Sequence, residues 1–233
     1  MLGEAFQEDS LTSRGTAWGV LAEAASLLAS WLDDPERCAA MLVIGSGIRS
    51  TQWLWLEDDD RAMAVLRCVL EQVARSRTWR LKPEKARLLE ERSETTPRDW
   101  LENAGWRRLS PLNRALGEFA HVRPSSRWNA ARELLASLQL DVDEDTAIFT
   151  ARGAALDFVS MLAAEEVVAS MREVSAEVAA AVESGFGELG LLGDGSAQEI
   201  EQRFTHIWAQ RARALGTGRP WPSAGVVSHA PPV

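Results

Sequence analysis

The chain has 233 residues, of which 46% are hydrophobic and 25% are charged, and its formal net charge is -9. A chain of this length and apolar content can bury a core, which excludes general disorder. The acidic balance excludes a protein that coats nucleic acid by bulk attraction. No basic leader followed by an apolar segment opens the chain, and no apolar run reaches the roughly 18 residues that a membrane span needs. We therefore expect a cytoplasmic protein without a membrane segment.

Helical periodicity recurs along the first hundred residues, and capping residues and prolines mark where successive helices begin. Ser10 can cap the first helix, and Pro35 opens the second. The acidic run 58–60 suits the amino end of a third helix, because negative charge is favourable there. The expected helices are 10–33, 35–56, one that starts at 58–60, 83–91 and 97–103.

Helical signals continue through the second half of the chain. Ser110 and Pro111 combine a capping residue with a proline in the first turn, and Pro124 ends the helix that they start. A long run of helix formers follows, with Gly153 as its only interior weak point. The expected helices are 110–123, one from 125 or 126 to 138, and one or two within 143–183.

No stretch alternates with the period of a strand between hairpin turns, so we predict an all-α fold. The expected architecture is a helical bundle with a long C-terminal helix or helix pair. We place the helical-bundle domain at 1–184, a Gly-rich joint at 185–195, an amphipathic C-terminal helix at 196–215 and a disordered tail at 216–233.

Several apparent motifs do not fit their known chemistry. The segment "LVIGSGIRST" (42–51) lacks the third glycine of a dinucleotide fingerprint and the lysine of a P-loop, so Gly45 and Gly47 are expected to admit a close helix or to break this one. Glu118 and His121 have di-metal spacing, but a second such pair is missing. We expect no metal and no cofactor.

Cysteines and tryptophans are expected in the core. Cys38 and Cys68 form no Cys-x-x-Cys pair, which predicts neither a disulfide framework nor a zinc site. The chain has ten tryptophans and no tyrosine. We interpret five of them as packing residues rather than as a base-stacking platform: Trp18, Trp31, Trp79, Trp100 and Trp128.

A local basic window interrupts the acidic chain. Residues 107–132 contain six arginines and one acidic residue, so the window carries +5. A basic surface of this kind on an acidic protein is a plausible anion site. Its polar residues could add phosphate or base contacts, and we select Arg108, Asn113, Arg123 and Arg127 as candidate substrate-binding residues.

Arg114 and His121 share one helix face in this window. They are seven positions apart, which places them within about 20° of each other and about 10 Å apart along the axis, with Glu118 beside them. A histidine titrates near neutral pH and can move protons, and an arginine can hold a phosphodiester. RNA supplies its own 2′-hydroxyl nucleophile, so a metal-free ribonuclease needs little else. Alternatively, Arg114 and Glu118 are an ordinary surface pair.

The segment "NRALGEFAH" (113–121), with its arginine, six-residue spacer and histidine, resembles the motif of the HEPN superfamily. These are helical-bundle proteins, many of them metal-independent RNases of toxin–antitoxin and phage-defence systems. The segment "LRCVLEQVARSRTWRL" (66–81) is similar to an Arg-x-x-x-Glu helix of bacterial relatives. The resemblance covers roughly 62–138. It implies that Arg114 is a phosphate or transition-state ligand, that His121 is the acid/base, and that the motifs of two protomers face each other across a homodimer.

Arg67, Glu71 and Arg75 follow one another at four-residue steps on the third helix, opposite its apolar stripe. Such ladders usually face solvent. In the alternative interpretation, Arg67 and Glu71 support Arg114 or His121.

Three function classes therefore stay open. The first is a metal-independent RNA-cleaving or nucleotide-binding protein, whose partners would be RNA or a nucleotide and an antitoxin. The second is a non-catalytic all-α interaction or scaffold protein, in which His121 is an ordinary residue near a helix end. The third is a small-molecule-binding protein or enzyme with a pocket between helices.

Overall fold

The computed structural model describes residues 8–57, 59, 61–110, 112–113, 116–117 and 144–192. Within these residues the chain forms seven α-helices and one 3₁₀-helix and has no strand, so the predicted all-α fold is confirmed. The elements are α1 (Glu8–Ala29), α2 (Pro35–Leu56), α3 (Arg61–Leu81), α4 (Pro83–Glu90), α5 (Pro97–Asn103), η1 (Arg107–Leu109), α8 (Glu144–Val174) and α9 (Ala176–Glu188). None of the described helices is long and apolar enough to cross a membrane.

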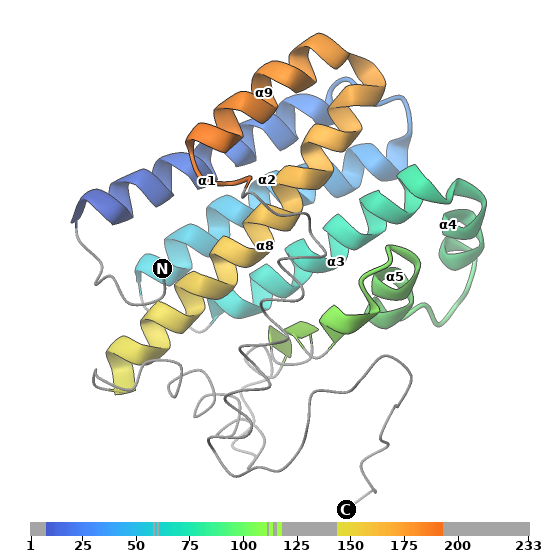
Figure 1. Cartoon of the computed structure of the whole chain (residues 1–233). Helices are drawn as coiled ribbons and strands as arrows, with labels where there is room; N and C mark the ends of the chain where they lie inside the picture. The colour runs from blue at the N-terminus through green and yellow to red at the C-terminus, as the bar shows by residue number, and fades with distance from the viewer. Residues whose placement is uncertain are drawn as a thin grey trace, which may run out of the picture.

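The helices pack as a bundle. Helices α1, α2 and α3 form a layer, and α8 crosses over it (Figure 1). Helix α2 lies between α1 and α3, and α8 contacts all three. Helix α9 turns back against α8 and α1, while α4 and α5 pack against α3. The rings of Trp18 and Trp55 meet edge to face in the core, with centroids 5.3 Å apart. Helix α3 is thus the element that links the core to α4, α5 and η1.

Local chemistry explains where the helices begin. The side chain of Asp34 accepts hydrogen bonds from the backbone N–H groups of Glu36 and Arg37, both at 3.0 Å, and Pro35 occupies the first turn of α2. Prolines also occupy the first turns of α4 and α5. Ser175 separates α8 from α9, and its hydroxyl accepts a hydrogen bond from the N–H of Val178.

Two glycines of α2 let its neighbours approach closely. A Cβ on Gly45 would lie 2.7 Å from the carbonyl oxygen of Ala22 in α1, and a Cβ on Gly47 would lie 2.4 Å from Cγ2 of Val69 in α3. Helix α2 runs without a break through both positions. Of the two roles expected for these glycines, close helix approach is therefore confirmed.

We expect Gly47→Ala to lower the free energy of unfolding by about 1–3 kcal/mol, because the new methyl group overlaps the fully buried Val69. Gly187→Ala is the matched control. Gly187 is exposed, and a Cβ at this position would meet no atom within 4 Å, so this change should be neutral or should stabilise by about 0.5–1 kcal/mol. Urea unfolding of both variants measures the difference, and equal losses would contradict this account of the α2–α3 contact.

Several expected helix limits differ in the structure. Helix α1 begins at Glu8, so Ser10 lies inside the helix instead of capping it. Helix α1 ends at Ala29 instead of 33, because the chain turns at Ser30 and must reach the extended conformation that Asp34 adopts as a cap. The expected one or two helices within 143–183 are two, α8 and α9, divided at Ser175, whereas the expected weak point Gly153 packs on the ring of Trp55 inside a continuous α8. Helix α9 continues through the first residues of the expected 185–195 joint and ends at Glu188.

Two expected core residues are exposed. Trp31 lies in the turn after α1, and Cys68 lies on the side of α3 opposite the buried Leu66 and Leu70. Cys38 is partly buried against the core. Three of the selected tryptophans are buried as expected: Trp18, Trp79 and Trp100. Trp128, the expected helix that ends at 138, the 196–215 helix and the 216–233 tail lie outside the described residues.

Candidate functional site

The predicted site lies in the segment 112–121, whose first described residues pack into the core of the bundle. Leu112 and Leu116, two residues of the expected apolar stripe, are buried, and residues 112–113 and 116–117 are helical. Five predicted site residues lie outside the described residues: Arg114, Glu118, His121, Arg123 and Arg127. Their predicted roles stay predictions, so the geometry around this segment comes from its described neighbours.

The Arg67–Glu71 ion pair lies against this segment. The Nε of Arg67 donates to Oε1 of Glu71 at 2.8 Å, and the two side chains are only 28% and 23% exposed. A Cβ on Gly117 would lie 2.7 Å from Nη1 of Arg67, so the guanidinium contacts the Gly117 backbone directly. The structure therefore brings the Arg67 guanidinium against Gly117, a residue that lies between Arg114 and His121 in the sequence.

The expected three-residue ladder on α3 stops at Glu71. Arg75 is instead bound to Glu36 of α2 and, at 2.6 Å, to Glu90 of α4, and its guanidinium lies 5.7 Å from the ring centroid of Trp100. The expectation that Arg67, Glu71 and Arg75 all face solvent is therefore wrong. Neighbouring elements cover it, and each arginine has a separate partner.

Helix α3 also anchors the chain that leads into the segment. The Nε of Arg77 donates to the carbonyl oxygen of Ala104 at 3.1 Å, and its guanidinium carbon lies 4.9 Å from the ring centroid of Trp106. Arg77 and Arg67 are ten residues apart on α3, which is about 15 Å along the helix axis. Contacts at 104–106 and at 117 show that this part of the chain runs antiparallel to α3.

The two other described candidates differ in burial. Arg108 is exposed. Asn113 is 7% exposed, and its Oδ1 is buried without a hydrogen-bond partner among the described residues. An unpaired buried carbonyl is costly, so this oxygen is a place where a donor from a ligand or from the rest of the segment would be favourable. Substrate contact by Arg108 and Asn113 stays a prediction.

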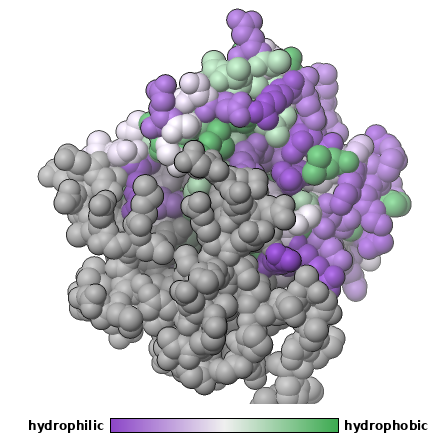
Figure 2. Space-filling model, viewed as in Figure 1, coloured by the Kyte–Doolittle hydropathy of each residue, from purple (hydrophilic) through white to green (hydrophobic). Residues whose placement is uncertain are grey.

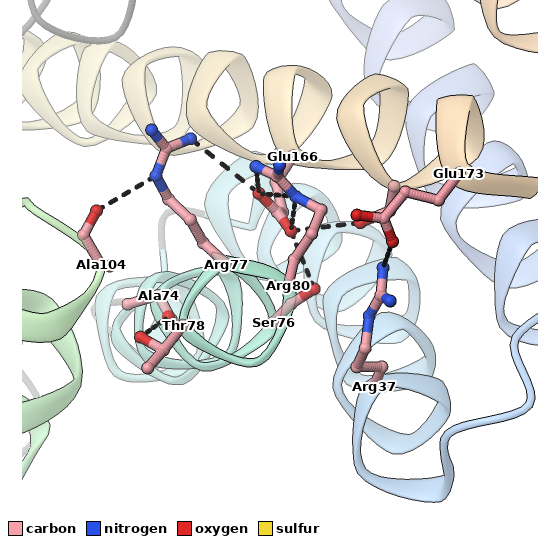
Figure 3. Close-up of polar contacts among 10 residues, drawn as sticks. Arg37, Ala74, Ser76, Arg77, Thr78, Arg80, Ala104, Glu166 and Glu173 are labelled. Atoms are coloured by element: carbon pink, nitrogen blue, oxygen red, sulfur yellow. Dashed lines mark hydrogen bonds and ion pairs between the residues drawn. The ribbon is translucent and has the colours of Figure 1, made fainter. Parts of the chain in front are cut away.

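A second polar cluster lies buried between α3 and α8 (Figure 3). The carboxylate of Glu166 is fully buried and receives hydrogen bonds from Nη2 of Arg80 at 2.9 Å and Nε at 3.1 Å. The hydroxyl groups of Ser76 and Ser170 donate to its Oε1 at 3.2 and 3.1 Å. Burial acts to lower the pKa of Arg80, but the hydrogen bonds and charge of Glu166 outweigh it and raise that pKa above its usual value.

The Glu166 cluster links helices rather than forming a reaction site. Both of its carboxylate oxygens already accept hydrogen bonds from this chain, which leaves little capacity for a ligand. Glu166 was not among the candidate residues expected from the sequence. The sequence does contain an indication of its burial. Glu166 lies four residues from Leu162 and four from Ser170 within an apolar run of a helix, and an acidic residue in such a run needs a buried partner.

Comparison of the chain with protein-family models, with curated proteins and with solved structures finds no match. The functional proposal therefore depends on the residues and contacts of this chain.

Proposed function

We propose that this protein binds RNA and cleaves it without a metal ion, as a HEPN-like nuclease of toxin–antitoxin or phage-defence type. The observation that carries the proposal is the contact between the Arg67 guanidinium and Gly117. Arg67 belongs to a partly buried ion pair, and Gly117 lies in the sequence between Arg114 and His121, within a window of +5 charge. The chemistry needs an acid/base and a cation that are held at a fixed separation.

In the proposed reaction His121 accepts the proton of the RNA 2′-hydroxyl, whose oxygen attacks the adjacent phosphorus. The bond from phosphorus to the 5′-oxygen breaks, and the leaving oxygen takes up a proton. The products are a 2′,3′-cyclic phosphate and a 5′-hydroxyl. Arg114 stabilises the negative charge that develops on the phosphoryl oxygens. No redox step and no additional reactant are required.

In this proposal Arg67 is a positioning residue. Its charge is already paired with Glu71, so it adds little net attraction for phosphate. Its guanidinium instead holds the backbone at Gly117 at a fixed distance from α3. Displacement of a catalytic group by about 1 Å can cost a hundredfold in rate, so this contact has a measurable consequence.

We expect Arg67→Met and Gly117→Ala each to lower kcat for RNA cleavage about tenfold or more, with a smaller change in KM. The first removes the guanidinium, and the second pushes it away with a methyl group. Arg87→Met is the matched control, because Arg87 forms an exposed ion pair with Glu84 on α4. Cleavage of tRNA in EDTA measures the effect. Equal kcat for all four proteins, with the fold intact by circular dichroism, would remove the support for a site beside Gly117.

One observation favours the second candidate, a non-catalytic interaction protein. Large apolar side chains are exposed on α1 and α2, including Trp53 at 69% exposure. An apolar surface of this extent is typical of a contact with another protein. It does not compete with the nuclease proposal, since one chain can carry both a site and an interface.

A further inference from the structure

The outer side of α1 and α2 is mostly apolar. We define the α1–α2 surface as the exposed residues between 16 and 31 and between 39 and 56. They are Thr16, Val20, Glu23, Leu27, Ser30, Trp31, Ala39, Leu42, Val43, Ser46, Arg49, Ser50, Trp53 and Leu56. Glu23 and Arg49 are the charged members of this set, and they form an ion pair with each other. The surface as a whole is therefore neutral.

The two helices present this surface together because they pack antiparallel. A Cβ on Gly15 of α1 would lie 3.0 Å from Nε2 of Gln52 in α2, and a Cβ on Gly45 of α2 would lie 2.7 Å from the carbonyl oxygen of Ala22 in α1. These two contacts place the amino half of α1 beside the carboxyl half of α2.

Apolar side chains lie at both ends of the α1–α2 surface, and the ion pair lies between them. In the antiparallel register Leu27 of α1 lies within one turn of Leu42 of α2, whereas Trp53 lies beside the amino half of α1. Leu42 is 50% exposed and Trp53 is 69% exposed. The Glu23–Arg49 ion pair separates the two apolar ends.

The outer face of α4 is different. Its exposed residues include Glu84, Lys85, Arg87 and Glu90. The described part of the face shown in Figure 2 is mostly hydrophilic at right, where α4 lies in Figure 1. A polar outer face is the usual pattern for a helix in contact with water. The α1–α2 surface departs from this pattern, which indicates that another segment or molecule covers it.

The spacing on α1 fits a helix as the covering element. Its outward residues Thr16, Val20, Glu23 and Leu27 follow one another at steps of four, three and four. This alternation keeps the side chains in a single row along the helix, and helices that pack along one another show it. A helix is therefore a better fit to this surface than a loop or a small ligand.

The segment 196–215, the expected amphipathic helix, has an apolar face with the same spacing. On a helix, six of its residues would share an arc of about 100°. They are Ile200, Phe204, Ile207, Trp208, Arg211 and Leu215. From Phe204 the steps to Trp208, Arg211 and Leu215 are four, three and four. The charged residue of this face, Arg211, thus has the same place in its row as Glu23 has in the row on α1.

We propose that the segment 196–215 packs as a helix on the α1–α2 surface of its own chain, parallel to α1. Matching the two rows places Arg211 opposite Glu23, and it places the apolar residues on either side of Arg211 opposite the two apolar ends of the surface. The carboxylate of Glu23 can accept hydrogen bonds from Arg211 while it keeps its pair with Arg49, because its two oxygens can serve two guanidinium groups.

The last described residues lie within reach of this surface. Helix α9 packs against α8 and α1 and runs back alongside α1 (Figure 1), and Leu191 after it is buried. The eight steps from Leu192 to Ile200 can span up to about 28 Å. Helix α1, which the chain must pass, is only about 10–12 Å wide with its side chains. The joint before the segment is therefore long enough to bring it to the outer side of α1.

A segment of the same chain has an advantage over a separate partner at this surface. A short link to α9 gives the segment an effective concentration on the order of millimolar, which a free partner rarely reaches. The inference is independent of the proposed function, because the α1–α2 surface and the Arg67–Gly117 contact lie on different helices.

Limited proteolysis of the full chain by trypsin tests this packing at Arg203, which lies within the segment. Trypsin cleaves a helix only after the helix opens, so the cleavage rate measures the fraction of molecules in which the segment is free. We expect cleavage after Arg203 to be at least about tenfold slower in the protein than in a synthetic peptide of residues 196–215. This protection should not depend on protein concentration, because the contact lies within one chain.

Trp53→Glu and Leu42→Glu should each remove most of the protection, because they place a charge beneath the apolar residues of the segment. Leu88→Glu is the matched control, since Leu88 is a similarly exposed apolar residue on α4, and it should keep the protection of the wild type. All three sites are exposed, so circular dichroism should show the same helical bundle in each variant.

Charge exchange tests the orientation of the segment. Glu23→Arg and Arg211→Glu should each speed cleavage after Arg203 about two- to fivefold, because each places like charges opposite one another. The double variant should return to the wild-type rate, since opposite charges then face each other again. Double-variant cleavage as fast as in the single variants would contradict the proposed pairing of Glu23 with Arg211.

Three results would overturn the proposal. Wild-type cleavage as fast as that of the peptide would show that the segment leaves the α1–α2 surface open to another protein. Protection that increases with protein concentration would assign the surface to a second copy of the chain. Protection that Trp53→Glu and Leu42→Glu leave unchanged would place the segment elsewhere on the molecule.

Discussion

Replacing Glu166 by leucine is expected to lower the free energy of unfolding by about 3–5 kcal/mol. The leucine leaves the guanidinium of Arg80, which is only 13% exposed, without its carboxylate partner. It also removes the acceptor for the hydroxyl groups of Ser76 and Ser170, two buried residues. A loss of this size is a large fraction of the stability of a single domain, because such domains are stable by only about 5–15 kcal/mol.

The control for Glu166→Leu is Glu183→Leu. Glu183 also forms an ion pair with an arginine, Arg172, but both side chains are about half exposed. An exposed pair contributes about 0–1 kcal/mol, so this variant should unfold close to the wild type. Glu166→Gln keeps the side-chain shape and some hydrogen bonds, and its intermediate loss can be measured if the leucine variant does not fold.

A double variant tests the physical reason for this effect. If the cost comes from the unpaired Arg80, then Glu166→Leu combined with Arg80→Met should recover most of the lost stability, because neither charge of the Arg80–Glu166 pair is left. Urea unfolding of the four proteins gives the coupling free energy. Additive losses from the two single variants would contradict the buried ion pair as the link between α3 and α8.

The helix pattern could be predicted because its signals are local. Pro35, Pro83 and Pro97 fix their own backbone angle and need no hydrogen-bond donor, so each marks the first turn of a helix wherever the rest of the chain lies. The break at Ser175 was harder to predict. Gly153 is the weaker helix former, but Trp55 of α2 packs where its side chain would be, and that contact is visible only in the folded chain.

The site and the surface depend on contacts between distant residues. Glu166 and Arg80 are 86 residues apart, and helical spacing alone gives no partner for either. Periodicity placed Arg67 opposite the apolar stripe of α3, but it could not show that Gly117 covers that side. In the same way, Leu42 and Trp53 each lie in a short apolar run of the sequence, and only the packing of α2 shows that they point away from the core.

We expect His121→Ala to lower the rate of RNA cleavage by about 10²–10⁴-fold, because the 2′-hydroxyl then loses its proton acceptor. Arg114→Ala should lower it by about 10²–10³-fold, because charge on the phosphoryl oxygens is no longer stabilised. The two losses should not add, since the residues act on one transition state. These effects exceed the loss expected for Arg67→Met, which changes only the position of the segment.

The most direct test of the proposed nuclease is cleavage of a panel of tRNA and structured RNA in EDTA by the wild type, His121→Ala and Arg114→Ala. Circular dichroism should first show that the three proteins have the same helical content. The proposal predicts cleavage by the wild type, with 2′,3′-cyclic phosphate ends, that either substitution abolishes. The same background cleavage from all three proteins would contradict it and would favour a non-catalytic interaction protein.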